Sequence, residues 1–330
     1  MSNFSFRSIR GGYLSEYRTE IYGVAALLII IGHSQDFMTA IFSDAVISII
    51  GYGGIGVAMF AFLGGMGLWH SMQRDSNVGR FYIRRIKRLL IPYLIISIPY
   101  YIIFDWIIKG NLLLCLKDIT FVSYFLDGGG TWYVAWIFLM YIVYPWYYLL
   151  GEKLFKRHRE VLSMIALGVM IIAEVALVST GNESVITKYQ NSFGATIAIV
   201  IGDCLAKDIK KDKKYVLWLS LACIILAPLY LFDIVSGAAV YVWFFALEGI
   251  FLCGLFSILF CLLNGGLLSR AAAVLGAASL ESYMFNVYLI SFARLILGNS
   301  ISTMWGVVGY LVVCIVGLGF AYFVHIALNS

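Results

Sequence analysis

Charged residues are scarce in this chain of 330 residues. Only 12% of the residues are Asp, Glu, Lys or Arg, whereas 62% are hydrophobic and 16% are aromatic. A soluble domain of this length carries about twice that charged fraction. The scarcity excludes an ordinary soluble enzyme, and the recurring apolar runs predict an all-α, polytopic membrane protein.

Several motifs of enzymes and metal sites are also missing. The sequence has no GxSxG, HExxH or P-loop motif, so a covalent serine mechanism of the hydrolase type has no signature. Six scattered cysteines form no CxxC pair, and we expect neither a disulfide framework nor a bound metal. The chain has no convincing internal repeat, which disfavours a transporter built from two related halves.

Ten membrane spans are predicted from the apolar runs, together with the side on which each connection lies. The spans cover residues 21–42, 46–70, 89–108, 132–150, 161–180, 191–206, 215–233, 239–262, 272–297 and 303–327. Nineteen Lys and Arg residues lie in the N-terminal tail and in the connections after even-numbered spans, against four on the opposite side. By the positive-inside rule, we expect both termini to be cytoplasmic. The net charge of +5 thus reflects topology, and no nucleic-acid partner is expected.

The polar connections are short. None is long enough to bury a core of its own, so we expect one transmembrane domain over residues 1–330. The first apolar segment follows a polar, Arg-containing stretch and has no small-residue cleavage site, which indicates a retained helix.

A single histidine, His33, lies within the first predicted span. Ionisable groups at that depth are costly and usually face a cavity or a pathway. Asp36 follows three residues later, on the same face of a continuous helix. A carboxylate on one imidazole nitrogen would make the other a general base. The alternative is a structural histidine bonded to a backbone carbonyl or a neighbouring helix.

Three arginines mark the start of the third span. Arg84 and Arg88 are four residues apart, and Arg85 and Arg88 are three apart, so one helical face carries several cations. Guanidinium groups bind phosphate oxygens bidentately, which suits a polyphosphate ligand. The same residues would also set topology or bind anionic lipid, and the sequence alone does not separate these interpretations.

Two further features have alternative interpretations. The glycines of the second span indicate either close helix packing, which is favoured, or room for a ligand beside the backbone. Trp132 and Tyr133 follow a glycine-rich outer connection and indicate either an interfacial aromatic belt, which is favoured, or the mouth of a pocket.

Three acids, Glu174, Glu248 and Glu281, fall within apolar spans. Each needs a partner, a proton or a water-filled cavity. A proton-coupled carrier would use such acids, so they do not by themselves separate a carrier from an enzyme.

Together, these segments resemble the acyltransferase 3 family of membrane acyltransferases. The similar segments are Gly23–Ser34 with its histidine, Val57–Gly65 against "FFFLSG", Phe81–Pro92, Thr131–Tyr133 followed by Tyr141 and Pro145, and Ser279–Tyr283. Each motif is degenerate, and their order and spacing make the set specific.

Four positions depart from the family pattern. The arginine that the family has eleven residues before its histidine is Tyr22 here, and we expect Arg18, one turn earlier, to replace it with help from Glu20. The Asp and Ser of the second-span motif are Ala58 and Gly64. The late histidine is Asn286, which we place with Glu281 among the substrate-binding residues.

The resemblance implies a multi-pass enzyme of the bacterial plasma membrane that transfers an acyl group. The donor would be acetyl-CoA, and the acceptor a hydroxyl of an envelope polysaccharide or a lipid-linked sugar. His33 would be the general base, with direct transfer or an acyl-histidine intermediate. No permanently bound cofactor is expected, and a separate extracytoplasmic partner is one option. The rival interpretations are a polysaccharide exporter or flippase and a proton-coupled carrier.

Overall fold

The computed structural model describes residues 10–231, 234, 236–263 and 265–329, and this part of the chain is helical without any strand. The helices are α1 (Tyr13–Glu16), α2 (Arg18–Gly32), α3 (Gln35–Met38), α4 (Asp44–Gly51), α5 (Gly56–Arg74), α6 (Val78–Pro92), α7 (Ile98–Tyr101), α8 (Leu112–Ile119), α9 (Val122–Asp127), α10 (Trp132–Phe155), α11 (Glu160–Ser179), α12 (Glu183–Lys210), α13 (Lys214–Ala222), α14 (Leu226–Leu231), α15 (Ala238–Leu263), α16 (Leu267–Ala277), α17 (Ser279–Leu297) and α18 (Met304–Asn329). The predicted all-α class is confirmed.

Seven helices among the described residues are long and apolar enough to cross a membrane. They are Asp44–Arg74, Val78–Ile108, Trp132–Phe155, Glu160–Ser179, Ala238–Leu263, Ser279–Ser302 and Met304–Leu328. The other three predicted spans take different forms. The first is the 15-residue helix α2 followed by the short α3, the sixth lies in the charge-bearing α12, and the seventh falls in a shorter apolar helix, Lys214–Tyr230.

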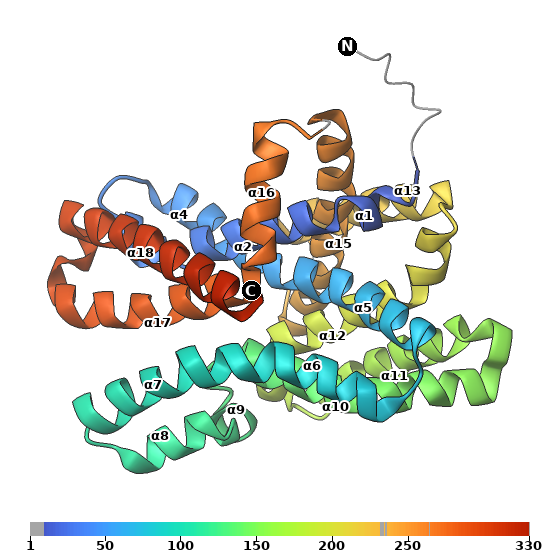
Figure 1. Cartoon of the computed structure of the whole chain (residues 1–330), viewed down its shortest axis with the longest axis horizontal. Coiled ribbons are helices and arrows are strands. Elements are labelled where there is room, and N and C mark those ends of the chain that lie inside the picture. Colours follow the sequence, from blue (N-terminus) through green and yellow to red (C-terminus); the bar gives the residue numbers. More distant parts are fainter. Residues whose placement is uncertain (1–9, 232–233, 235, 264, 330) are drawn as a thin grey trace.

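The helix that contains the arginine motif continues through two wide turns. After Pro92, π-helical segments occupy Tyr93–Ser97 and Ile102–Ile108 and flank the short α7. Pro99, at the start of α7, follows the first of these segments, and because a proline lacks its N–H and crowds the preceding turn, a wider turn accommodates it without ending the helix. In Figure 1, α6 and α7 form one continuous rod, α8 and α9 fold back beside α7, and α17 and α18 form an antiparallel pair.

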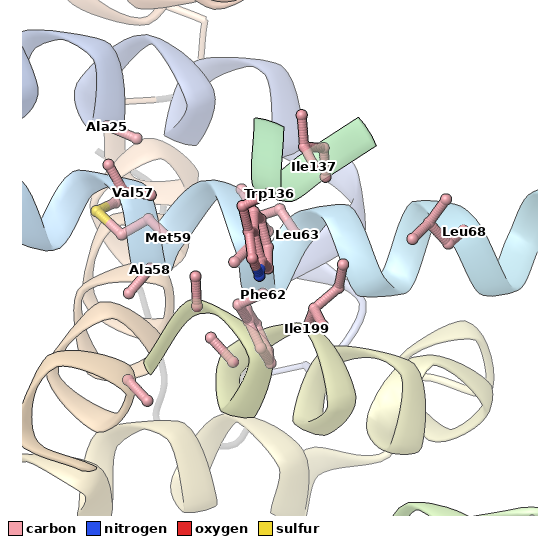
Figure 2. Close-up of a cluster of buried hydrophobic side chains, with 14 of the residues drawn as sticks. Ala25, Val57, Ala58, Met59, Phe62, Leu63, Leu68, Trp136, Ile137 and Ile199 are labelled. Atoms are coloured by element: carbon pink, nitrogen blue, oxygen red, sulfur yellow. The ribbon is translucent and has the colours of Figure 1, made fainter. Parts of the chain in front are cut away.

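Helix α5 lies at the centre of the hydrophobic core. Figure 2 shows Phe62 and Leu63 of α5 among Ala25 of α2, Trp136 of α10 and Ile199 of α12. Gly65 lies directly against the backbone of Ile199, so a Cβ atom at this position would collide with it. The favoured interpretation of the second-span glycines, close helix packing, is confirmed at this position.

Candidate functional site

The ring of His33 is held by a residue far away in the sequence. His33 caps the C-terminal end of α2, and its Nδ1 lies 3.1 Å from Oδ1 of Asn286 on α17. With the amide oxygen facing the ring, as in this structure, Nδ1 would donate the hydrogen bond and Nε2 would carry the lone pair. Asn286 is only 2% exposed, and its amide nitrogen is buried without a hydrogen-bond partner among the described residues. This arrangement suits a neutral histidine that accepts a proton at Nε2.

The expected pairing of Asp36 with His33 is wrong. Oδ2 of Asp36 instead accepts a hydrogen bond of 2.7 Å from Nη2 of Arg294, and both side chains are more than half exposed. The cause is the end of α2 at Gly32: His33 and Ser34 form a turn before the short α3 begins at Gln35. A face shared at a spacing of three residues requires a continuous helix, which is absent here.

A pocket and a larger cavity lie next to each other at the other end of α2. The pocket, of about 100 Å³, is lined by Arg18, Tyr22, Phe60, Gly64, Leu68, Arg85, Arg88, Leu89, Tyr133, Ile137, Tyr141, Ser279, Leu280 and Tyr283. The cavity, of about 710 Å³, is lined by Arg18, Gly67, His70, Ser71, Gln73, Arg74, Arg85, Arg88 and Lys210. Three arginines belong to both linings. We call the larger cavity the basic chamber and the smaller pocket the aromatic pocket. The shared arginines place the two next to each other.

Arg18 reaches along α2 toward Tyr22. Its Nη2 donates a hydrogen bond of 2.8 Å to the hydroxyl of Tyr22, and its guanidinium lies 5.2 Å from the centre of that ring. Gly67 of α5 leaves the room for this side chain, because a Cβ atom there would collide with the guanidinium. The predicted help from Glu20 is not seen: Glu20 accepts a hydrogen bond of 3.4 Å from Ser269 of α16.

The three arginines of α6 that were predicted to share one face do not act as one group. Nη2 of Arg85 donates to the carbonyl of Gly67 at 2.9 Å, and the exposed Arg88 lines both the chamber and the pocket. Arg84 is instead bound to Asp75 at 3.0 Å. Hydrogen bonds from Arg80 and Arg84 hold the pKa of the Asp75 carboxyl well below its usual range. Arg84 thus belongs to a structural cluster at the start of α6.

The aromatic residues separate in a similar way. Tyr133 of α10 lines the pocket, with its ring centre 5.3 Å from that of Tyr283 on α17. Trp132 is not part of the lining and packs edge-on against Tyr133 at 5.9 Å. The interpretation of this segment as a pocket wall therefore holds for Tyr133. Gly64 adds space, because a Cβ atom there would meet nothing within 4 Å.

The pocket and His33 are connected through α17. Tyr283 lines the pocket, and Asn286, which binds His33, follows three residues later on the same helical face. His33 itself lies eleven residues beyond Tyr22, roughly 16 Å at about 1.5 Å per residue. One turn of α17 therefore separates the aromatic pocket from the partner of the histidine ring.

The three buried acids lie on three different helices. Oε1 of Glu281 lies 3.5 Å from Nδ1 of His325, beside a hollow of about 510 Å³ that Arg88 also lines. Glu174 accepts a hydrogen bond of 2.8 Å from the indole of Trp243, and Glu248 is buried in α15. No group of three or more His, Cys, Asp and Glu side chains that could hold a metal lies together within residues 10–231, 234, 236–263 and 265–329.

Some residues of the site were not singled out from the sequence as functional. Phe60, Tyr141 and Tyr283 fall in the motifs that carried the resemblance, but only the fold shows that they line one pocket. His70 and Lys210 line the basic chamber and have no sequence signal, because they come from the ends of α5 and α12.

Comparison with known families gives one match. A family model described as an acyltransferase domain matches residues 23–325, which is nearly the whole chain. Comparisons with curated proteins and with solved structures find no match.

Proposed function

Because the chain belongs to the acyltransferase family whose model matches residues 23–325, we propose that it moves an acetyl group from cytoplasmic acetyl-CoA to a hydroxyl of an envelope glycan. The acceptor would be an envelope polysaccharide or a lipid-linked sugar. Acyl transfer is the activity of the family. The donor, the acceptor and the roles of individual residues are the parts that we propose.

The basic chamber is the proposed site for the phosphates of CoA. Arg18, Arg85 and Arg88 line it together with Arg74 and Lys210, and its 710 Å³ falls within the range of about 300–1,000 Å³ usual for ligand sites. Guanidinium groups bind phosphate oxygens in a fork geometry. The aromatic pocket beyond it is narrow, which suits the thin pantetheine arm rather than the nucleotide.

His33 is the proposed proton acceptor. Nε2 would take the proton of the acceptor hydroxyl as its oxygen attacks the thioester carbonyl. The C–S bond then breaks, and the imidazolium returns the proton to the CoA thiolate. Asn286 supports this role: with its amide oxygen toward the ring, Nδ1 would donate the hydrogen bond and Nε2 would be left to act as the base. Direct attack needs no covalent intermediate on the enzyme.

The proposed topology keeps ten spans, with both termini in the cytoplasm of a bacterial inner membrane. The segments α2–α3, α12 and α13–α14 would complete the seven long apolar helices. The positive-inside bias then puts Arg18, Arg85 and Arg88 on the cytoplasmic side, where CoA is found. His33 would lie deeper, toward the side from which the glycan arrives. A separate extracytoplasmic partner that receives the acyl group is compatible with this arrangement.

The main support for the proposal is a short distance along α17. Tyr283, which lines the aromatic pocket, and Asn286, which contacts His33, are one helical turn apart. The test supplies acetyl-CoA labelled in its acetyl group to membranes that contain the protein and follows label into the glycan fraction. We expect labelling that depends on His33 and disappears in His33→Ala. An exporter or a proton-coupled carrier would leave the glycan unlabelled, and unlabelled glycan would refute the proposal.

A further inference from the structure

A second cavity of about 710 Å³ lies where the ends of α5, α10 and α12 meet the start of α11. Its lining residues are Trp69, Gln73, Glu152, Lys156, His158, Arg159, Glu160, Asp203, Cys204, Lys207 and Lys211. It shares only Gln73 with the basic chamber. We call it the Arg159 cavity. None of its cations takes part in the proposed binding of acetyl-CoA.

Arg159 is the central cation of this cavity. Its side chain is only 8% exposed, and its Nη2 donates a hydrogen bond of 2.8 Å to Oδ1 of Asp203. Tyr144 and Ser163 also donate to Asp203, and the guanidinium lies 4.5 Å from the centre of the Tyr148 ring. The other terminal nitrogen, Nη1, is buried and has no hydrogen-bond partner among the residues that the structure describes. Leaving a buried charged donor unpaired is costly, so an acceptor from outside this network, a water or a ligand oxygen, would stabilise the site.

The carboxylates around the cavity already have partners. Glu152 lies 3.7 Å from Nε of Arg159, and Glu160 lies 3.2 Å from Nδ1 of His158. Lys156 and Lys211 are exposed at the rim and form no ion pair among the described residues. The two rim lysines and Nη1 of Arg159 are cationic donors, and they favour a ligand with anionic oxygens.

An apolar groove continues from the cavity along the bundle. It measures about 680 Å³ and shares Glu160, Cys204, Lys207 and Lys211 with the Arg159 cavity. Its apolar lining residues are Met164, Leu167, Ile201, Leu205, Leu219, Leu247 and Ile250. Met164 is 63% exposed, and only 11% of the most apolar window of α11 is buried, so this helix presents its side chains outward.

We propose that the Arg159 cavity and this groove together bind one glycerophospholipid. The phosphate diester would accept hydrogen bonds from Nη1 of Arg159 and from Lys156 and Lys211, and one acyl chain would lie along the groove. A basic pocket beside membrane-facing apolar surface is the geometry that recognises a lipid headgroup. The groove distinguishes a lipid from a free phosphate or a nucleotide, neither of which has an acyl chain to fill it. The proposal does not depend on the acetyl-transfer reaction.

Native mass spectrometry of the purified full chain tests this inference. The probe is dioleoyl phosphatidylglycerol titrated in detergent, with glycerol 3-phosphate as the headgroup without chains. We expect one tightly bound lipid per chain and no retained glycerol 3-phosphate. Lys156→Gln/Lys211→Gln should weaken lipid binding by about tenfold or more, since each removes a charge-assisted bond. Met164→Trp, which fills the groove, should weaken it as well.

Matched variants serve as controls. Lys153→Gln/Arg270→Gln removes two exposed cations that do not line the cavity, and Val169→Trp places the same bulky side chain at an exposed position of α11 outside the groove. Both should bind lipid like the unmodified protein. Unchanged binding in both Lys156→Gln/Lys211→Gln and Met164→Trp would overturn the proposal. Retention of glycerol 3-phosphate by the unmodified protein would also overturn it. So would a Lys156→Gln/Lys211→Gln variant with a raised KM for acetyl-CoA and normal lipid binding, because that result would assign the cavity to the nucleotide.

Discussion

Asn286 lies 253 residues after His33 in the sequence, and its Oδ1 is 3.1 Å from Nδ1 of the histidine ring. This contact orients the ring from another helix, whereas Asp36, the carboxylate expected beside it, is bound to Arg294. The ring is therefore oriented by a neutral amide. Such a partner orients the ring without adding a negative charge that would raise its basicity.

Asn286→Ala should lower kcat by on the order of ten- to a hundredfold, because the ring loses the acceptor that orients it. The KM for acetyl-CoA should change little, since Asn286 does not line the basic chamber. Steady-state kinetics of the purified variant measures both. Asp36→Asn is the matched comparison: its ion pair is exposed and should matter little. An Asp36 variant as inactive as Asn286→Ala would show that the carboxylate has a direct role.

Arg85→Gln and Arg88→Gln should each raise the KM for acetyl-CoA by about tenfold, because each removes a charged donor from the chamber. Arg84→Gln is the control on the same helix, since Arg84 is bound to Asp75. It should leave that KM nearly unchanged. If all three variants had the same KM as the unmodified enzyme, the arginines of α6 would only set topology.

Two adjacent glycines of α5 should respond in opposite ways. Gly64→Leu projects into open space in the aromatic pocket and should block acetyl-CoA use without loss of folded protein. Gly65→Ala meets the carbonyl of Ile199 and should destabilise the fold by about 1–3 kcal/mol. Thermal unfolding in detergent and turnover, measured together, separate the two effects. Full activity in Gly64→Leu would mean that the donor does not enter this pocket.

Arg18 should replace the arginine that is absent at Tyr22. Arg18→Ala should lose most activity, and Arg18→Ala/Tyr22→Arg should regain it, because both side chains line the same pocket. The measurement is acetylation by membranes that hold equal amounts of each variant. If Arg18→Ala alone kept its activity, Arg18 would be only a positive-inside anchor.

The sequence predicted what depends on composition and local pattern. Low charge and apolar runs were enough to predict a helical membrane protein. The order of the motifs was enough to predict the family. Contacts between distant segments could not be predicted from the sequence. The contact of Asn286 with His33, for example, requires α2 and α17 to be neighbours. The pairing with Asp36 failed because no local signal showed that α2 ends at Gly32. Arg84 does not line the basic chamber with Arg85 and Arg88, because it is bound to Asp75 in the turn before α6.

The central claim is that His33 accepts the proton of the acceptor hydroxyl, and the rate of acetyl transfer by purified His33→Ala tests it most directly. The protein would be assayed with saturating acetyl-CoA and glycan, next to the unmodified enzyme. The account predicts a fall in kcat of about 10²–10⁴-fold, with acetyl-CoA binding by calorimetry unchanged. A His33→Ala variant that transfers acetyl groups at the rate of the unmodified enzyme would contradict it.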